Sequence, residues 1–176
     1  MKQLTLLPNS KNAYGGDLRN TRKGRSGPRP LATKSSMHLV LRSSKAKGAW
    51  SFRAHKGAVR RIVERFGVKY GVRIVSLANV GNHLHFQIQL GDRFTYAPFI
   101  RAITSAIAMA VSGNSRWRKK TIPGGFWDRR PFTRVIIGWR AVLGLRDYIM
   151  INKIEGHGYS REEAQWLLRN YRESPA

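Results

Sequence analysis

The chain has 176 residues, which is long enough for one folded domain with its own core and short for two. Hydrophobic residues make up 41%, which excludes wholesale disorder, and the absence of cysteine excludes disulfides and thiolate metal sites. Lys and Arg number 33 against 9 Asp and Glu, so the net charge of +24 predicts a polyanionic partner.

Nucleic acid and a membrane surface are the two polyanions that such a charge can serve. We find no apolar run that approaches the length of a spanning helix and no signal-peptide pattern. The lack of cysteine is compatible with a reducing cytoplasm. We therefore expect a cytoplasmic protein that binds nucleic acid through its phosphates and does not bind a membrane.

Residues 1–33 are predicted to form a basic flexible arm. Turn formers and cations dominate it, as in Arg22-Lys23-Gly24-Arg25-Ser26-Gly27-Pro28-Arg29-Pro30. A segment of this composition buries too little apolar surface to order itself. It would either lie along phosphates or act as a solubilising tail, and the sequence leaves both open.

From residue 34 the apolar pattern predicts strand, helix, strand, strand, helix, strand and helix in that order. The expected ranges are 37–43, 54–70, 72–80, 83–90, 96–111, 132–137 and 140–153, with a hairpin turn at Gly81-Asn82. This order predicts an α+β fold of the ferredoxin-like split βαβ type, with a central antiparallel sheet and helices on one face. We expect a single domain at 34–158, followed by a C-terminal helix within 159–176 that opens with the capping box Ser160-Arg161-Glu162-Glu163.

The strand at 83–90 carries two histidines on its polar side. Its apolar residues (Leu84, Phe86, Ile88 and Leu90) alternate with its polar ones (His83, His85, Gln87 and Gln89). One face can pack on a core, while the other presents two imidazoles about 7 Å apart. Two neutral imidazoles this close can hold one divalent ion with a third, oxygen ligand. A solvated polar face is the alternative interpretation.

The helix at 140–153 supplies the candidate nucleophile. Tyr148 and Asn152 are four residues apart and lie on one side of that helix, so it can present a phenol and an amide oxygen together. Tyrosine is poorly ionised near neutral pH and needs activation by a metal, a base or a cationic field. A packed aromatic side chain is the alternative.

Aromatic residues alternate with cations in the connector at 116–130. Trp117, Phe126 and Trp127 can stack on bases while neighbouring Arg and Lys hold phosphates. The same three residues can instead form a small core beneath a long loop. The sequence leaves both interpretations open.

Four stretches follow one another in the order and spacing of a known family. They are Met37-His38-Leu39-Val40-Leu41-Arg42, Gly81-Asn82-His83-Leu84-His85-Phe86, Phe126-Trp127-Asp128-Arg129 with Phe132-Thr133-Arg134-Val135-Ile136, and Tyr148-Ile149-Met150-Ile151-Asn152-Lys153. The tripeptide His83-Leu84-His85 is similar to the HUH motif (His, apolar, His) of single-strand DNA nucleases. Together the four stretches resemble the REP-associated tyrosine transposases, which are single-tyrosine relatives of the smallest insertion-sequence transposases.

The resemblance implies an HUH-type tyrosine transposase. His83, His85 and Asn152 would hold Mg²⁺ or Mn²⁺, and Tyr148 would attack a DNA phosphodiester to leave a 5′-phosphotyrosine link and a free 3′-OH. Relatives often have Asn-Pro after the tyrosine, where this chain has Asn152-Lys153, and a Tyr-Asp pair where it has Phe132-Thr133. Gln87 or Gln89 is therefore the alternative third ligand.

The expected partner is single-stranded or hairpin DNA, with Arg42, Arg129, Arg130 and Arg134 as candidate contacts. Two other functions stay open. One is an HUH nuclease of the replication or relaxation type, and the other is a non-catalytic nucleic-acid-binding protein. The sequence leaves the DNA target open, as well as whether the protein is a monomer or a homodimer and whether Tyr148 serves its own site or a partner's.

Overall fold

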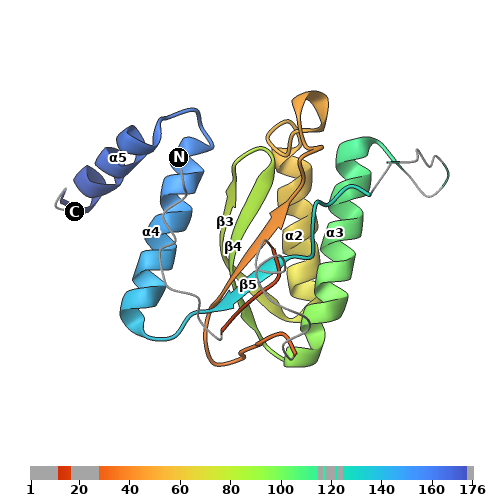
Figure 1. The fold of residues 1–176 in the computed structure, drawn as a ribbon, viewed down its shortest axis with the longest axis horizontal. Helices are drawn as coiled ribbons and strands as arrows, with labels where there is room; N and C mark the ends of the chain where they lie inside the picture. Colours follow the sequence, from red (N-terminus) through yellow and green to blue (C-terminus); the bar gives the residue numbers. More distant parts are fainter. Residues whose placement is uncertain (1–11, 17–27, 115–116, 118–121, 123–124, 174–176) are drawn as a thin grey trace.

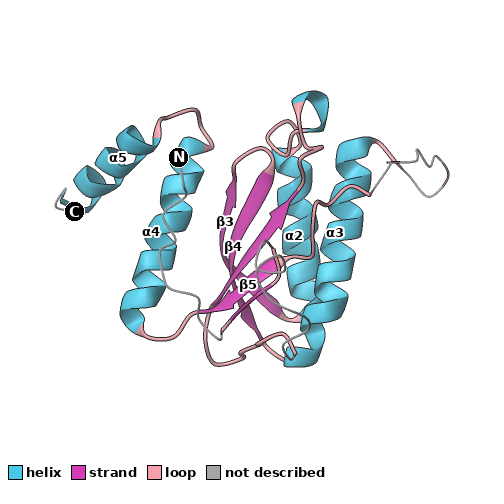
Figure 2. Cartoon of the chain, viewed as in Figure 1, coloured by secondary structure: helices cyan, strands magenta, loops and turns pink. Residues whose placement is uncertain are grey.

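The computed structural model describes residues 12–16, 28–114, 117, 122 and 125–173, which form a five-stranded sheet with helices on both sides (Figure 1 and Figure 2). The strands are β1 (Ala13–Tyr14), β2 (Met37–Arg42), β3 (Val72–Asn79), β4 (His83–Leu90) and β5 (Phe132–Val135). The α-helices are α2 (Lys56–Tyr70), α3 (Tyr96–Ser112), α4 (Trp139–Glu155) and α5 (Arg161–Glu173).

The sheet has the strand order β1-β5-β2-β4-β3, and every neighbouring pair is antiparallel. With α2 between β2 and β3 and α3 between β4 and β5, this is the ferredoxin-like split βαβ arrangement. The predicted α+β fold is therefore confirmed. The expectation that the helices share one face is correct for α2 and α3 only, because α4 lies on the opposite face (Figure 1).

The main core fills the space between the sheet and the pair α2 and α3. The alternation predicted for the histidine strand is observed, since its four apolar residues are at most 1% exposed. The other members of this core with no exposed surface are Met37, Leu39, Phe52, Val63, Phe99, Ile103 and Ile107. The face of the sheet toward α2 and α3 is thus mainly apolar, and Thr133 of β5, opposite Leu39, is a buried polar residue on it.

One segment, Arg93–Ser112, is long and apolar enough by length and composition to cross a membrane. This corrects the expectation that no run approaches that length. Phe99, Ile103, Ile107 and Val111 of α3 all point into the main core. A helix that packs one side against a sheet passes the same composition test, because its core-facing side is built from apolar residues.

A smaller apolar cluster attaches α4 to the other face of the sheet. Ile149 is fully buried and packs with Leu145, Ala78 and Ile136. The C-terminal end of α4 is held near the β3–β4 hairpin, where Arg53 donates a hydrogen bond of 3.0 Å to the carbonyl of Glu155. The helix therefore lies along the polar face of β4, and this position decides how the histidines are enclosed.

Two stretches of the predicted arm belong to the folded domain. Ala13 and Tyr14 pair with β5 as the edge strand β1. Arg29 donates from Nη1 to the carbonyl of Pro131 (2.9 Å) and to Oγ1 of Thr133 (2.5 Å). The partners of Arg29 lie about a hundred positions away in the sequence, so no local sequence pattern predicts these contacts. The remainder of the predicted arm lies outside the described residues.

The predicted capping box is confirmed. Oγ of Ser160 accepts a hydrogen bond from the amide of Glu163 at 3.2 Å, and Glu163 accepts one from the amide of Ser160 at 2.6 Å. The helix that it opens, α5, lies beyond α4 and buries Ala164 completely (Figure 1).

Candidate active site

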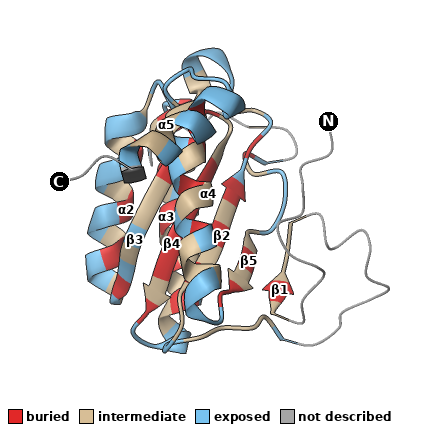
Figure 3. Ribbon diagram, turned by 90° about the vertical axis from the view of Figure 1, so that its left-hand side faces the viewer, coloured by how far each residue is buried: buried red, intermediate tan, exposed pale blue. Residues whose placement is uncertain are grey.

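The polar side of β4 is enclosed rather than solvated. His85 is 3% exposed and Gln87 is 4% exposed. Figure 3, viewed from the α4 side, shows α4 lying across the strands. A polar strand face open to water would not have these values. A solvated face is therefore excluded at His85 and Gln87, whereas His83 and Gln89 at the two ends of the strand are partly exposed. A buried imidazole such as that of His85 needs a chemical reason to be there.

A third histidine joins the predicted pair. In the register of β2 and β4, His38 lies opposite Gln87, which places its side chain on the same face as His85. The rings of His38 and His85 stack with centroids 5.5 Å apart, and Nε2 of His38 lies 3.2 Å from Nδ1 of His85. The ring of His83 meets that of His85 edge-on at 4.7 Å.

Tyr148 reaches this group from α4. Its ring lies 5.3 Å from the His85 ring and 5.7 Å from the His38 ring, centroid to centroid, edge-on to both. The structure therefore brings the predicted nucleophile and a predicted metal ligand together from elements sixty residues apart in the sequence. The sequence reasoning did not assign a site role to His38; its outward position in β2 was the available signal.

Asn152 lies one turn beyond Tyr148 and is 4% exposed. Its Nδ2 donates a hydrogen bond of 2.7 Å to the carbonyl of Tyr148, so the amide oxygen is the atom left to act as a ligand. Beyond it, a Cβ at Gly156 would lie 2.6 Å from the carbonyl of Asn79, which pairs with Leu84. The helix thus runs from His85 toward the end of β4 that carries His83.

Burial keeps the three imidazoles neutral. The pKa of His85 is well below its usual 6.5, first because the ring is desolvated and then because His38 and His83 are close. Burial, and then the charge of Arg42, lower the pKa of His83. Burial, and then Arg134, lower the pKa of His38 to about 4. Near neutral pH each ring therefore has one nitrogen lone pair.

The donor set suits a divalent ion that takes nitrogen and oxygen ligands. Nδ1 of His83 lies 2.6 Å from Oδ1 of Asn82, so its Nε2 keeps the lone pair. Nε2 of His85 is buried and has no hydrogen-bond partner among the described residues. Within that part of the chain no group of three or more His, Cys, Asp and Glu is placed to hold a metal. An amide oxygen is one donor that could complete such a site with the two histidines.

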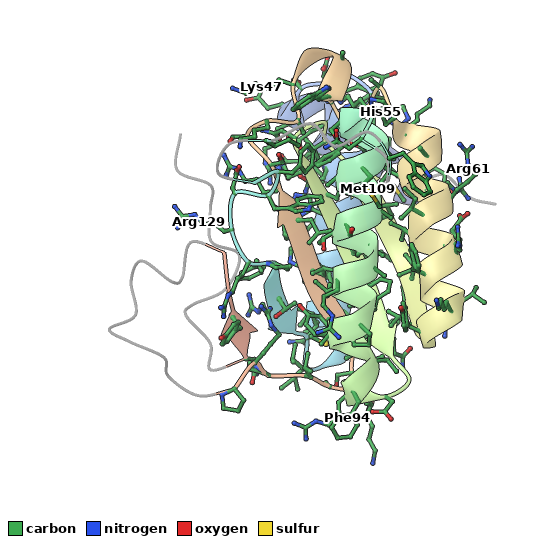
Figure 4. All side chains as sticks on the ribbon, turned by 90° about the vertical axis from the view of Figure 1, so that its right-hand side faces the viewer. Lys47, His55, Arg61, Phe94, Met109 and Arg129 are labelled. Carbon is green, nitrogen blue, oxygen red and sulfur yellow. The ribbon has the colours of Figure 1, made fainter. Side chains whose placement is uncertain are left out.

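Two of the four predicted DNA contacts lie on the face of the sheet that carries the histidines. Arg42 is opposite His83 in the strand register, with its Nε 3.7 Å from Oδ2 of Asp128. Arg134 is opposite His38. Arg129 and Arg130 are exposed in the segment before β5, and Arg129 points away from the body of the protein (Figure 4).

The connector aromatics separate into two groups. Phe126 belongs to the main core, and Trp127 stacks on Phe52 at 5.6 Å while its Nε1 donates to the carbonyl of Thr104 at 3.0 Å. Phe126 is therefore a core residue, and Trp127 packs against the core while part of it stays exposed. Trp117 is 92% exposed. Residues 116, 118–121 and 123–124 of the connector lie outside the described residues.

A family model described as an IS200-like transposase matches residues 32–152, which is more than half of the chain. The chain belongs to the IS200-like transposase family. No curated protein sequence matches it significantly.

The fold of this IS200-like transposase is similar to that of a solved structure, the REP-associated tyrosine transposase bound to a REP hairpin. The TM-score is 0.61 and the identity 14%, over 78% of this chain and 77% of that one. A candidate transposase from Deinococcus radiodurans has a TM-score of 0.45 and 16% identity, over 73% of this chain and 95% of that one. The fold likeness rests on the first of these.

The family predicted from the four sequence blocks is thus confirmed, and the likeness in fold extends to a REP-associated member. The region that the family model matches contains the three histidines of the site (His38, His83 and His85), together with Tyr148 and Asn152.

Proposed function

We propose that this protein cleaves and rejoins single-stranded or hairpin DNA, with Tyr148 as the nucleophile. The observation that carries the proposal is the contact of the Tyr148 ring with His85 beneath α4, in a chain of the IS200-like transposase family. The Tyr148 ring also packs against the smaller apolar cluster, and its contacts with His85 and His38 are what distinguish it from a residue that only packs. Residues 34–158 would form the catalytic domain.

In the proposed reaction Tyr148 Oη attacks the phosphorus of a DNA phosphodiester. The new bond joins phosphorus to the tyrosine oxygen, and the bond from phosphorus to the 3′-oxygen breaks. The phenol loses its proton, and the leaving 3′-oxygen gains one to become a free 3′-OH. The 5′-phosphotyrosine link retains the bond energy of the phosphodiester. A 3′-OH of another end can then attack it, which rejoins DNA and releases Tyr148.

His83, His85 and Asn152 would hold a Mg²⁺ or Mn²⁺ ion. When bound, such an ion supplies positive charge that polarises a phosphoryl oxygen. Asn152 is favoured over Gln87 because α4 runs toward His83, whereas Gln87 is four residues, about 13 Å, further along the strand. Gln87 also donates from Nε2 to Oγ of Ser36 at 3.1 Å. Gln89 is further still from His83.

The chain's own residues supply the remaining requirements. The enclosure of the site by α4 limits water at the reacting atoms, which favours transfer to DNA over hydrolysis. Arg42 and Arg134 lie on the same face as the histidines and would neutralise DNA phosphates. Because Tyr148 contacts His85 of its own chain, one copy of the protein would form a complete site.

Hairpin DNA is the proposed substrate because the solved relative is bound to a REP hairpin. The net charge of +24 suits a nucleic acid, and such a protein would work in the cytoplasm at the nucleoid.

The test incubates the protein with end-labelled hairpin DNA and Mn²⁺, followed by denaturing electrophoresis. We expect a covalent protein–DNA band that is lost in Tyr148→Phe and kept in Tyr159→Phe, since Tyr159 is exposed beyond the end of α4. A band of undiminished intensity in Tyr148→Phe would assign the nucleophile elsewhere. A nuclease of the replication type would instead cleave unstructured single strands as well as hairpins.

A non-catalytic nucleic-acid-binding protein would bind the same DNA without any covalent band. It would also lack thermal stabilisation by Mn²⁺, whereas the proposed site predicts stabilisation that disappears in the double variant His83→Ala, His85→Ala.

A further inference from the structure

The ligand nitrogen of His85 depends on where its ring carries the proton. A neutral imidazole has one N–H and one lone pair, and only the lone pair can bind a metal. Nδ1 of His85 lies 3.2 Å from Nε2 of His38, while Nε2 of His85 is buried without a partner among the described residues. The ring that donates in this contact therefore decides whether Nε2 of His85 carries a proton or a lone pair.

Two arrangements satisfy the contact between these rings. If His38 donates, His85 accepts at Nδ1 and must carry its own proton at Nε2, where a buried N–H finds no acceptor. If His85 donates from Nδ1, its Nε2 keeps a lone pair. Orphaned buried N–H groups are rarer in proteins than under-satisfied acceptors, so the second arrangement is favoured even before a metal binds.

His83 shows the same pattern with an unambiguous partner. Oδ1 of Asn82 can only accept a hydrogen bond, so Nδ1 of His83 is the donor at 2.6 Å and Nε2 has the lone pair. An acceptor at His38 would give His85 the same tautomer. Both histidines of the HUH motif would then have a lone pair at Nε2.

His38 is well placed to serve as that acceptor. Its ring stacks on His85 at an interplanar angle of 17° and meets the edges of Phe132 and Tyr148 at 6.0 and 5.7 Å. These contacts fix the orientation of the ring, with Nε2 of His38 facing Nδ1 of His85. Because that nitrogen faces Nδ1 of His85, His38 is not itself a third ligand of the proposed ion.

We infer that His38 is a positioning residue that accepts the Nδ1–H of His85 and thereby holds the Nε2 lone pair of His85 ready for the metal. The metal-binding half of this inference rests on the proposed function. Outer hydrogen-bond partners of this kind orient a histidine ligand and raise its basicity, and their loss typically weakens metal binding about 10- to 100-fold.

The test combines nitrogen NMR with metal binding. Long-range ¹H–¹⁵N spectra of the metal-free protein, assigned with His38→Gln and His85→Gln, report which ring nitrogen of His85 carries the proton. Mn²⁺ affinity is measured by electron paramagnetic resonance for wild type, His38→Gln and His38→Leu. Glutamine retains an acceptor oxygen near the position of Nε2, whereas leucine has a similar size and no acceptor.

We expect the Nδ1–H tautomer of His85 in the wild type. We also expect Mn²⁺ affinity within a few-fold of wild type for His38→Gln and about 10- to 100-fold weaker for His38→Leu. An Nε2–H tautomer in the wild type overturns the inference, as does wild-type affinity in a folded His38→Leu variant. If the wild type binds no Mn²⁺, the proposed metal site fails, and the nitrogen spectra alone decide the hydrogen bond.

Discussion

Mild acid is expected to destabilise the metal-free domain through the histidines beneath α4. Burial lowers the pKa of His38 from 6.5 to about 4, and it lowers the pKa values of His83 and His85 in the same direction. The unfolded chain therefore binds protons at a higher pH than the folded chain does. The stabilising effect is complete above about pH 6.5 and is lost as the pH falls toward 4.

His38 alone gives a measurable effect. Between about pH 7 and about pH 5 the unfolded chain gains most of one proton at this position while the folded chain gains almost none. The corresponding loss of unfolding free energy is about 2 kcal/mol. Domains of this kind have total stabilities of roughly 5–15 kcal/mol, so the change is large enough to measure.

The assay is urea denaturation followed by circular dichroism, at both pH values and with EDTA present. His38→Gln removes one titrating group and keeps a hydrogen-bond acceptor beside His85. We expect the wild type to lose about 2 kcal/mol more than this variant over the window. Equal losses in the two proteins would show that His38 is not a desolvated, neutral residue, and the account of the enclosed face would be wrong.

Three further predictions concern α4 and the cationic surface. Gly156→Ala should weaken formation of the protein–DNA adduct, because the added Cβ would lie 2.6 Å from the Asn79 carbonyl and displace the end of α4. Gly144→Ala should leave activity intact, because a Cβ there would meet no other atom within 4 Å. Ile149→Ala should lower the unfolding free energy in urea by about 2–5 kcal/mol, and Met150→Ala, which is 38% exposed, by far less. In plots of log affinity against log salt, Arg134→Gln should reduce the slope for DNA binding by about one, while Arg61→Gln, on α2 across the sheet, should not (Figure 4). A result in which each control behaves like its partner variant would contradict the placement of the site.

The core side of β4 and the identity of the family could be predicted from the sequence. Strict alternation over 83–90 fixes which side chains share a face, and four ordered motifs identify the IS200-like family. What alternation cannot reveal is the element that covers the polar face. A strand pattern is the same whether water or a helix lies against it, so the position of α4 required the structure.

His38 was missed because its role depends on strand register. It faces Gln87 and touches His85 only through the pairing of β2 with β4, across 47 residues of sequence. The edge strand β1 was missed for the same reason, because two residues carry no periodic signal and their pairing with β5 is non-local. The sequence could not distinguish base stacking from core packing for Phe126 and Trp127. The contacts of Trp127 with Thr104 and Phe52 that indicate packing are non-local.

The most direct test of the central claim is to identify the DNA-linked residue by mass spectrometry. After reaction with hairpin DNA and Mn²⁺, the protein is denatured and digested with a nuclease and trypsin. Cleavage after Arg146 and Lys153 yields a peptide in which Tyr148 is the sole tyrosine. The account predicts that this peptide carries a nucleotide through its tyrosine. A nucleotide on any other residue, or cleaved DNA without a linked peptide, would contradict it.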